Sequence, residues 1–271
     1  MQSPGAIAFS IFGIDVRWYG LLIGIGFILA ILISYKRAPR FGIESEHILD
    51  FAIWLIPCSI VGARLYYILF RWEYYAGDIG KMLDIRSGGL AIHGGLIAGI
   101  LVAYFVSRHY KFSFLDLLDV IFPSVALGQA IGRWGNFFNS EAHGTETTLP
   151  WAVIIDGKSY HPTFLYESIW CLLLFFLLLY LSRKRKFKGE IFLLYVMLYS
   201  FERFFVEGLR TDSLMIGPLR QAQVLSVCAI VVAAVLYAIG RSRARKALTA
   251  AGEAAPPAAP ETVSEDGGSE E

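Results

Sequence analysis

The chain has 271 residues, of which 56% are hydrophobic and only 17% are charged, and its formal net charge is +1. About a quarter of the residues of an ordinary soluble domain are charged, so this composition excludes that class and indicates a protein embedded in a membrane. With so little net charge and no helix that carries a basic face, the sequence gives no sign of nucleic-acid binding. The three cysteines are too scattered for a disulfide framework or a zinc site.

Apolar runs long enough to cross a hydrocarbon core recur along the sequence. A membrane-spanning helix needs roughly 17 to 25 such residues, and by this criterion we predict an all-α polytopic membrane protein with about seven spans. The predicted spans cover residues 18–34, 48–70, 90–106, 115–131, 164–181, 191–206 and 224–239.

Lysine and arginine gather after the first, third, fifth and seventh of these spans. Short loops that stay in the cytoplasm keep an excess of both residues, so the alternation predicts an N-terminus outside the membrane and a C-terminus in the cytoplasm. Residues 1–14 lack a charged beginning, so no cleavable signal is expected. The basic clusters are Lys36, Arg37 and Arg40; Arg108 and Lys111; residues 183–188; and Arg241, Arg243, Arg245 and Lys246.

The spans form one predicted membrane domain, residues 1–247, with an outward loop region at about residues 132–162. Inside this loop, an alternating segment around Asp156-Gly157 is typical of a β-hairpin with a two-residue turn. His161 and Glu167 flank a turn and the start of the next helix, which favours structural roles for both. After Leu248 the composition cannot bury enough apolar surface to fold, so residues 248–271 are predicted to be a disordered cytoplasmic tail.

Charged residues inside apolar spans, Glu202 among them, need a partner or a task, because inserting one at the bilayer centre costs about 2.5 to 3.5 kcal/mol. For Arg64, Asp116 and Asp119 we expect structural pairing or anchoring at the interface. The sixth span differs, because its polar residues recur at steps of four, four, four and three and so share one helical face. They are Tyr195, Tyr199, Arg203, Glu207 and Arg210. This face is expected to line the interior or a wet cavity, with Glu207 paired to both arginines.

The most informative segment is GRWGNFFNSEAHG, residues 132–144, which follows the fourth span. It combines an arginine, two amides and a carboxylate with glycines at a predicted membrane boundary. Guanidinium groups bind phosphate oxygens through two parallel N–H donors, so the pattern indicates an anion-binding active site. The residues concerned are Arg133, Asn136, Asn139 and Glu141.

His93 lies in SGGLAIHGGLIAG, with glycines on both sides. A lone histidine in an apolar run is usually a hydrogen-bonded core residue. The glycines either let backbone or substrate approach it closely or pack helices together. The sequence leaves both interpretations open.

Together these segments resemble the prolipoprotein diacylglyceryl transferases of bacteria over about residues 16–226. The resemblance implies an enzyme of the bacterial inner membrane whose active site lies toward the extracytoplasmic face. The implied reaction moves the diacylglyceryl group of phosphatidylglycerol to the lipobox cysteine thiol in the signal peptide of a preprolipoprotein. It forms a thioether and releases glycerol phosphate, as the first step of lipoprotein maturation, and no metal or organic cofactor is implied. The matching pieces are GRWGNFFNSEAHG, RWYG around Tyr19, GARLYY around Arg64, IHGGL around His93, and YSFERFFVEGLR followed by QVLS at Gln223.

The resemblance also implies roles for residues around the phosphate. Arg133 and Arg203 would grip the lipid phosphate and stabilise the leaving group. Asn136 and Gly144 would shape that pocket, and Glu141 would orient an arginine or the glycerol headgroup.

Displacement at the glyceryl carbon requires a thiolate, because a free thiol, with a pKa of about 8.5, is a poor nucleophile. His93 is the candidate base, helped by Tyr19, and the alternative is that the arginines lower the thiol pKa electrostatically. Tyr199 and Arg210 are implied as supports for the arginine of the sixth span. His143 is a further candidate for a titrating group near the phosphate.

Two other classes of function fit part of the pattern. Buried arginines and tyrosines can line the path of an anion transporter, but the charged residues here gather toward the outer half and no internal repeat is visible in the sequence. A different lipid-modifying enzyme, such as an acyltransferase or phosphatase, would use the same phosphate grip. That enzyme would need its own nucleophile, or a base that activates water or an acceptor hydroxyl.

Overall fold

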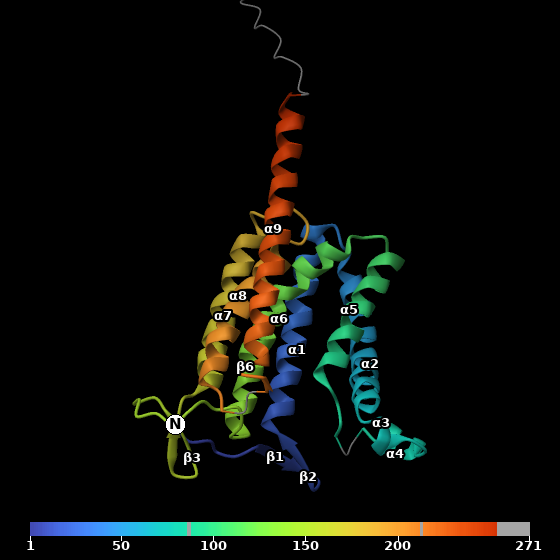
Figure 1. The fold of residues 1–271 in the computed structure, drawn as a ribbon. Coiled ribbons are helices and arrows are strands. Elements are labelled where there is room, and N and C mark those ends of the chain that lie inside the picture. Colours follow the sequence, from blue (N-terminus) through green and yellow to red (C-terminus); the bar gives the residue numbers. More distant parts are fainter. Residues whose placement is uncertain (86–87, 212–213, 254–271) are drawn as a thin grey trace, which may run out of the picture.

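A computed structural model describes residues 1–85, 88–211 and 214–253, and Figure 1 shows long helices that run side by side with small strands at one end. The long helices are α1 (Trp18–Arg37), α2 (Ser45–Phe70), α5 (Ile92–His109), α6 (Phe114–Phe138), α7 (Thr163–Ser182), α8 (Glu190–Leu209) and α9 (Gln221–Glu253). Shorter helical elements are η1 (Ala38–Phe41), α3 (Trp72–Tyr75) and α4 (Ile79–Leu83).

Within the described residues, 6 helices are long and apolar enough to cross a membrane. The long helix left out is α8, because Glu202, Arg203 and Glu207 interrupt its apolar sequence. It still packs against α6, α7 and α9, and its 20 residues span about 30 Å. The predicted class, an all-α polytopic membrane protein, is confirmed, and the sixth predicted span corresponds to this charged helix.

The long helices form two groups. α2 packs along α5, whereas α6 packs against α1, α7 and α8, and α9 covers α8. One apolar core joins the groups at the end of the molecule where α1 and α5 finish and α6 begins; we call it the shared core. It consists of Ala38, Ile43, Ile48, Phe51, Val102, Ala103, Val106, Leu117 and Val120.

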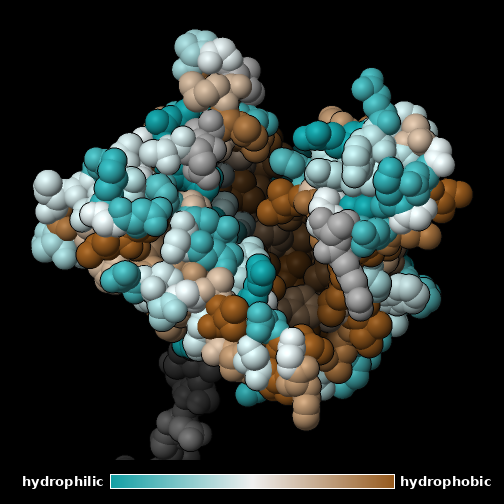
Figure 2. All heavy atoms as spheres, turned by 90° about the horizontal axis from the view of Figure 1, so that it is seen from below, coloured by the Kyte–Doolittle hydropathy of each residue, from teal (hydrophilic) through white to brown (hydrophobic). Residues whose placement is uncertain are grey.

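The opposite end of the molecule is hollowed between the two groups. Figure 2 shows a deep recess there, with a hydrophobic floor between rims of more hydrophilic residues. α3 and α4 lie on one side of this end and the hairpin of β3 on the other (Figure 1). A recess with apolar walls between membrane helices suits hydrocarbon chains better than a hydrated solute.

In the described part of the chain, three two-stranded antiparallel sheets lie at the hollowed end (Figure 1). They pair β1 (Ile7–Ile11) with β2 (Ile14–Arg17), β3 (Val153–Ile155) with β4 (Lys158–Tyr160), and β5 (Met215–Ile216) with β6 (Leu219–Arg220). At the β3–β4 turn, Asp156 and Gly157 have φ of 49° and 78°, the positive values that a two-residue type I′ turn requires. The predicted hairpin is confirmed, whereas the other two sheets are not among the sequence predictions.

The basic clusters lie at the end opposite the strands, which we call the basic end. Lys36 and Arg37 stand in the last turn of α1, and Arg108 stands in the last turn of α5. The N-terminal segment and the end of α9 lie at opposite ends of the bundle (Figure 1). α9 continues to Glu253, past the predicted start of the tail, and residues 254–271 fall outside the described residues.

Arg64 has a structural role, as expected. Its side chain is buried and, among the residues that the structure describes, donates to four backbone carbonyls, which ties the segment carrying α4 to α2. The acceptors are the carbonyl oxygens of Lys81 at 2.6 Å, Gly88 at 2.7 Å, and Met82 and Gly89 at 3.0 Å.

Asp116 and Asp119 are also structural partners, as expected. Both accept from Nη1 of Arg185, at 2.7 and 2.9 Å. Asp119 further accepts from the backbone N–H groups of Gly189 and Phe192, at 2.8 and 2.9 Å, where α8 begins. These carboxylates therefore fix the start of α8 against α6.

The glycine beside His93 packs α5 against α2. A Cβ atom added to Gly94 would run into the carbonyl oxygen of Gly62 and the Cβ atom of Tyr66. Small residues at contacts between membrane helices let the backbones approach closely. Of the two interpretations open at the sequence level, helix packing is the one that holds for Gly94.

The substitution Gly94→Ala should destabilise the protein by about 1 to 3 kcal/mol, because α2 and α5 would have to separate. Gly24→Ala is the matched control, since a Cβ atom there meets nothing within 4 Å. In the control the better helix propensity of alanine should leave stability unchanged or raise it by up to about 1 kcal/mol. Unfolding in detergent measures both effects, and equal stability of the two variants would contradict the packing role.

Candidate active site

Two arginines from different helices meet at one buried carboxylate near the hollowed end. Nη2 of Arg133, on α6, lies 2.5 Å from Oε2 of Glu167, on α7. Nη1 of Arg203, on α8, lies 3.5 Å from Oε1 of the same carboxylate. Nη2 of Arg203 also lies 2.6 Å from Oε2 of Glu207, one helical turn along α8. We call Arg133 and Arg203 the arginine pair.

Two tyrosines of α8 extend the polar face toward α6. Tyr199 accepts a hydrogen bond from Nη2 of Arg133 at 3.3 Å. Its ring stacks on that of Tyr195, with centroids 5.5 Å apart, and Tyr195 donates to Oε1 of Gln129 at 2.8 Å. The predicted stripe therefore faces the protein interior.

Hydrogen bonds between α6 and α7 fix the height at which Arg133 meets Glu167. Nε1 of Trp134 donates to Oγ of Ser168 at 3.1 Å. That hydroxyl in turn donates to the carbonyl oxygen of Ala130 at 2.8 Å. Because these residues adjoin the ion pair, sliding one helix along the other would break the hydrogen bonds and the ion pair together.

The arginine pair is partly exposed in front of buried carboxylates. The side chains of Arg133 and Arg203 are 20% and 21% exposed, whereas those of Glu167 and Glu207 are 1% and 4% exposed. Within the described residues, no hydrogen bond or ion pair uses Nε of either arginine. The carboxylates hold the guanidinium groups from behind, and N–H donors remain for an anion in front.

The loop after α6 forms a polar rim. Nδ2 of Asn136 and Nδ2 of Asn139 both donate to Oε1 of Glu141, at 3.0 and 3.2 Å. The partners of Glu141 described here are therefore amides and not an arginine. The ring of His143 lies against that of Tyr160, 4.3 Å between centroids.

Gly144 lies where this loop crosses the end of α8. Its N–H donates to the carbonyl oxygen of His161, and the N–H of Thr145 donates to that of Leu209, both at 2.9 Å. A Cβ atom at Gly144 would lie 2.7 Å from Cβ of His161, so a larger residue would push the loop away. Gly144 also forms a backbone bridge with Arg210, which brings these two predicted residues together.

His93 and Tyr19 stand on other elements. His93, in the first turn of α5, is exposed, and its ring centroid lies 5.9 Å from that of Tyr66 on α2. Tyr19, in the first turn of α1, is 42% exposed and packs over Gly135 of α6. Tyr19 is thus beside the helix segment that carries Arg133, whereas no contact among the described residues joins His93 to the arginine pair.

Glu167 is the residue of this site that the sequence does not single out, because its position at a helix start favours a purely structural role. A carboxylate in an apolar span is costly to insert into the membrane, and this cost indicates that Glu167, like the other charged residues of the spans, needs a partner or a function. Glu202 is marked by that cost, and it is 6% exposed with neither carboxylate oxygen hydrogen-bonded within the described residues. No contact among the described residues explains why Glu202 is buried.

The fold is that of a polytopic membrane protein, with a partly exposed arginine pair on a buried carboxylate. The chain belongs to the prolipoprotein diacylglyceryl transferase family, whose model matches residues 6–239.

Curated relatives are similar over most of their length. One from Finegoldia magna is 53% identical over 86% of this chain and 94% of its own. One from Clostridioides difficile is 50% identical over 83% of this chain and 91% of its own, and one from Listeria monocytogenes is 47% identical over 85% and 88%. All three are named phosphatidylglycerol–prolipoprotein diacylglyceryl transferase.

The substitution Glu167→Gln should destabilise the protein by about 3 to 5 kcal/mol, because the arginine pair would lose its shared buried counter-charge. Glu146→Gln is the matched control, since Glu146 pairs with Lys158 where both side chains are more than half exposed. That control should change stability by less than about 1 kcal/mol. Unfolding in detergent tests both, and a Glu167→Gln variant as stable as the control would show that the bridge is not needed.

Proposed function

We propose that the chain transfers the diacylglyceryl group of phosphatidylglycerol to the lipobox cysteine thiol of a preprolipoprotein. Family membership and the names of the relatives support the substrates and the transfer. The observation that carries the assignment to this site is the partly exposed arginine pair on the buried carboxylate of Glu167.

In the proposed reaction, the cysteine sulfur attacks the glyceryl carbon that carries the phosphate. The carbon–oxygen bond breaks and its electron pair goes to the phosphate oxygen, so glycerol phosphate leaves and a thioether remains. Negative charge collects on the phosphate as this happens. Arg133 and Arg203 stabilise that charge, and their N–H donors need no reorientation during the reaction because the carboxylates already hold them in place.

Asn136, Glu141 and Gly144 form the rim that shapes the headgroup pocket. The amide groups fix the exposed carboxylate of Glu141, whose oxygens can also accept from the glycerol hydroxyls of the headgroup. Tyr199 supports Arg133 through its hydrogen bond, and Arg210 supports the pocket through its backbone bridge with Gly144.

The thiol proton goes to His93 on α5, and Tyr19 on α1 assists it. A general base contributes about 100-fold or more to the rate of such a step. The alternative is that the arginines lower the thiol pKa and solvent takes the proton. The first route requires that the recess bring the peptide cysteine between α5 and α6.

We place the protein in the bacterial inner membrane with the arginine pair toward the extracytoplasmic face. Support comes from the basic clusters, which lie at the opposite end of the helices and mark the cytoplasmic side in short-looped membrane proteins. The apolar recess of Figure 2 then opens to the outer face, where lipid and signal peptide can enter.

The substitutions Arg133→Ala and Arg203→Ala should each lower turnover at least about 100-fold, because the leaving phosphate loses a fixed positive charge. Arg71→Ala is the control, an exposed arginine at the end of α2 on the same end of the molecule. Mass spectrometry of a lipobox peptide incubated with phosphatidylglycerol detects the diacylglyceryl adduct, and a Cys→Ser peptide checks the acceptor. Normal turnover in Arg203→Ala would refute the phosphate grip.

The substitution His93→Gln should lower turnover about 100-fold or more without changing the affinity for phosphatidylglycerol, because only proton removal is affected. His109→Gln, an exposed histidine at the last turn of α5, should behave like the wild type. Initial rates at saturating lipid distinguish the two routes. Full activity in His93→Gln would contradict the role of His93 as the base and would favour the alternative in which the arginines lower the thiol pKa.

A further inference from the structure

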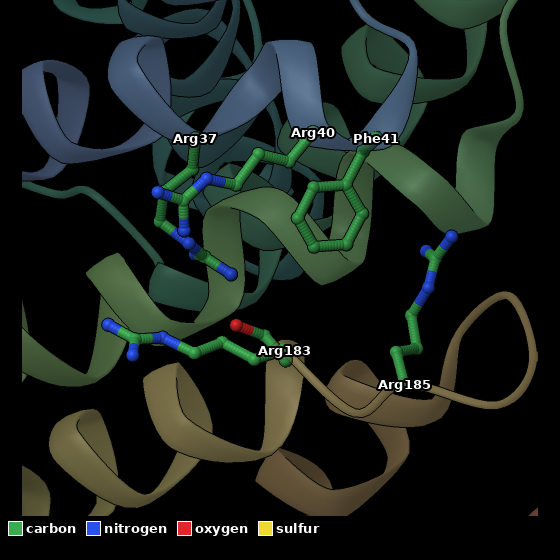
Figure 3. Close-up of a pocket in the computed structure, with 6 residues that line it drawn as sticks. Arg37, Arg40, Phe41, Arg183 and Arg185 are labelled. Carbon is green, nitrogen blue, oxygen red and sulfur yellow. The ribbon is translucent and has the colours of Figure 1, made fainter.

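A second arginine cluster surrounds a cavity at the basic end, far along the helices from the arginine pair. The cavity holds about 440 Å³ and lies between the end of α1 with η1 and the end of α7 (Figure 3). It is lined by Arg37, Arg40, Phe41, Ser182, Arg183 and Arg185.

The positive charge around this cavity exceeds the charge of the carboxylates that contact it. Arg185 is paired with Asp116 and Asp119, as described above. Arg37 is 8% exposed and donates to the carbonyl oxygens of Val120 and Asp119, at 2.5 and 3.2 Å. Arg37 is therefore buried on neutral acceptors, and its charge is not neutralised by contact with a carboxylate within the described residues.

Arg40 and Arg183 add two further positive charges to the cavity. Neither guanidinium group makes a hydrogen bond or an ion pair in the part of the chain that the structure describes, and both side chains are exposed. Figure 3 shows Arg37 and Arg40 extending into the space above Arg183, with Arg185 on the other side of Phe41. The guanidinium carbons of Arg37 and Arg185 lie 5.6 and 4.6 Å from the ring centre of Phe41, which holds both in place.

A second cavity extends the site along α1 and α7. It holds about 220 Å³, shares Arg37, Arg40, Ser182 and Arg183 with the first, and adds Ile33, Lys36 and Leu179 to its walls. Ile33 and Leu179 stand one helical turn before Arg37 and Arg183, on the membrane side of each arginine. The site is thus basic at its outer end and apolar at its inner end.

We propose that this cavity binds the phosphate headgroup of an anionic phospholipid, with the start of its acyl chains in the groove between Ile33 and Leu179. Guanidinium groups match phosphate oxygens, and basic pockets between membrane helices are typical sites for anionic lipid headgroups. The apolar continuation favours a lipid over free phosphate. This site is separate from the proposed active site and does not depend on the reaction proposed there.

The test uses native mass spectrometry of the full-length protein in detergent with dioleoyl phosphatidic acid. Two variants carry the same change of charge: Arg40→Gln with Arg183→Gln, and Arg243→Gln with Arg245→Gln, exposed positions of α9. The first variant should lose one bound lipid, with affinity on the order of tenfold or more weaker. The control variant should bind like the wild type, and dioleoyl phosphatidylcholine should bind weakly to all three.

Equal lipid binding by the two variants would overturn the proposal. Displacement of the lipid by inorganic phosphate at equal concentration would also overturn it, because the site would then recognise the anion alone. Diacylglyceryl transfer in detergent should stay within about twofold of the wild type in the Arg40→Gln, Arg183→Gln variant, since these residues lie outside the proposed catalytic machinery. Lost turnover with unchanged lipid binding would assign these arginines to the reaction and refute a separate lipid site.

Discussion

The ion cluster of Glu167 with Arg133 and Arg203 is the interaction on which the arrangement of the site depends. The carboxylate lies between two guanidinium groups that would otherwise repel each other, and it is almost completely shielded from water. Removing one partner of a buried ion pair is strongly destabilising, and the partners of this carboxylate come from two different helices. The ion cluster therefore links α6, α7 and α8 at one level, together with the hydrogen bonds of Trp134 and Ser168 beside it.

The same ion cluster accounts for Arg203 and Glu207, two of the charged residues of α8. Arg203 is neutralised once within α8, by Glu207, and once across the interface, by Glu167. At the other end of the same helix, Asp119 accepts from the first backbone N–H groups. α8 is thus fixed at both ends by polar contacts, and it also packs against α7 and α9.

Much of this could be predicted from the sequence, because the signals involved are local. Lengths of apolar runs locate the helices, the Asp156-Gly157 pair locates one hairpin, and the spacing of polar residues identifies the inward face of α8. The β1–β2 turn escapes prediction because Phe12 adopts a positive φ of 51°, and an aromatic residue is no signal for that conformation. Glu167 escapes because its partners lie on two other helices, and a single sequence does not show which residues meet across three helices.

The position of the shared core has a consequence for the shape of the recess. It joins the two helix groups only at the basic end, so the recess has one wall on α2 and α5 and the other on the group that carries the arginine pair. Both arginines of the pair belong to the second wall. Substitutions on the first wall can therefore change the width and shape of the recess without disturbing the ion cluster of Glu167.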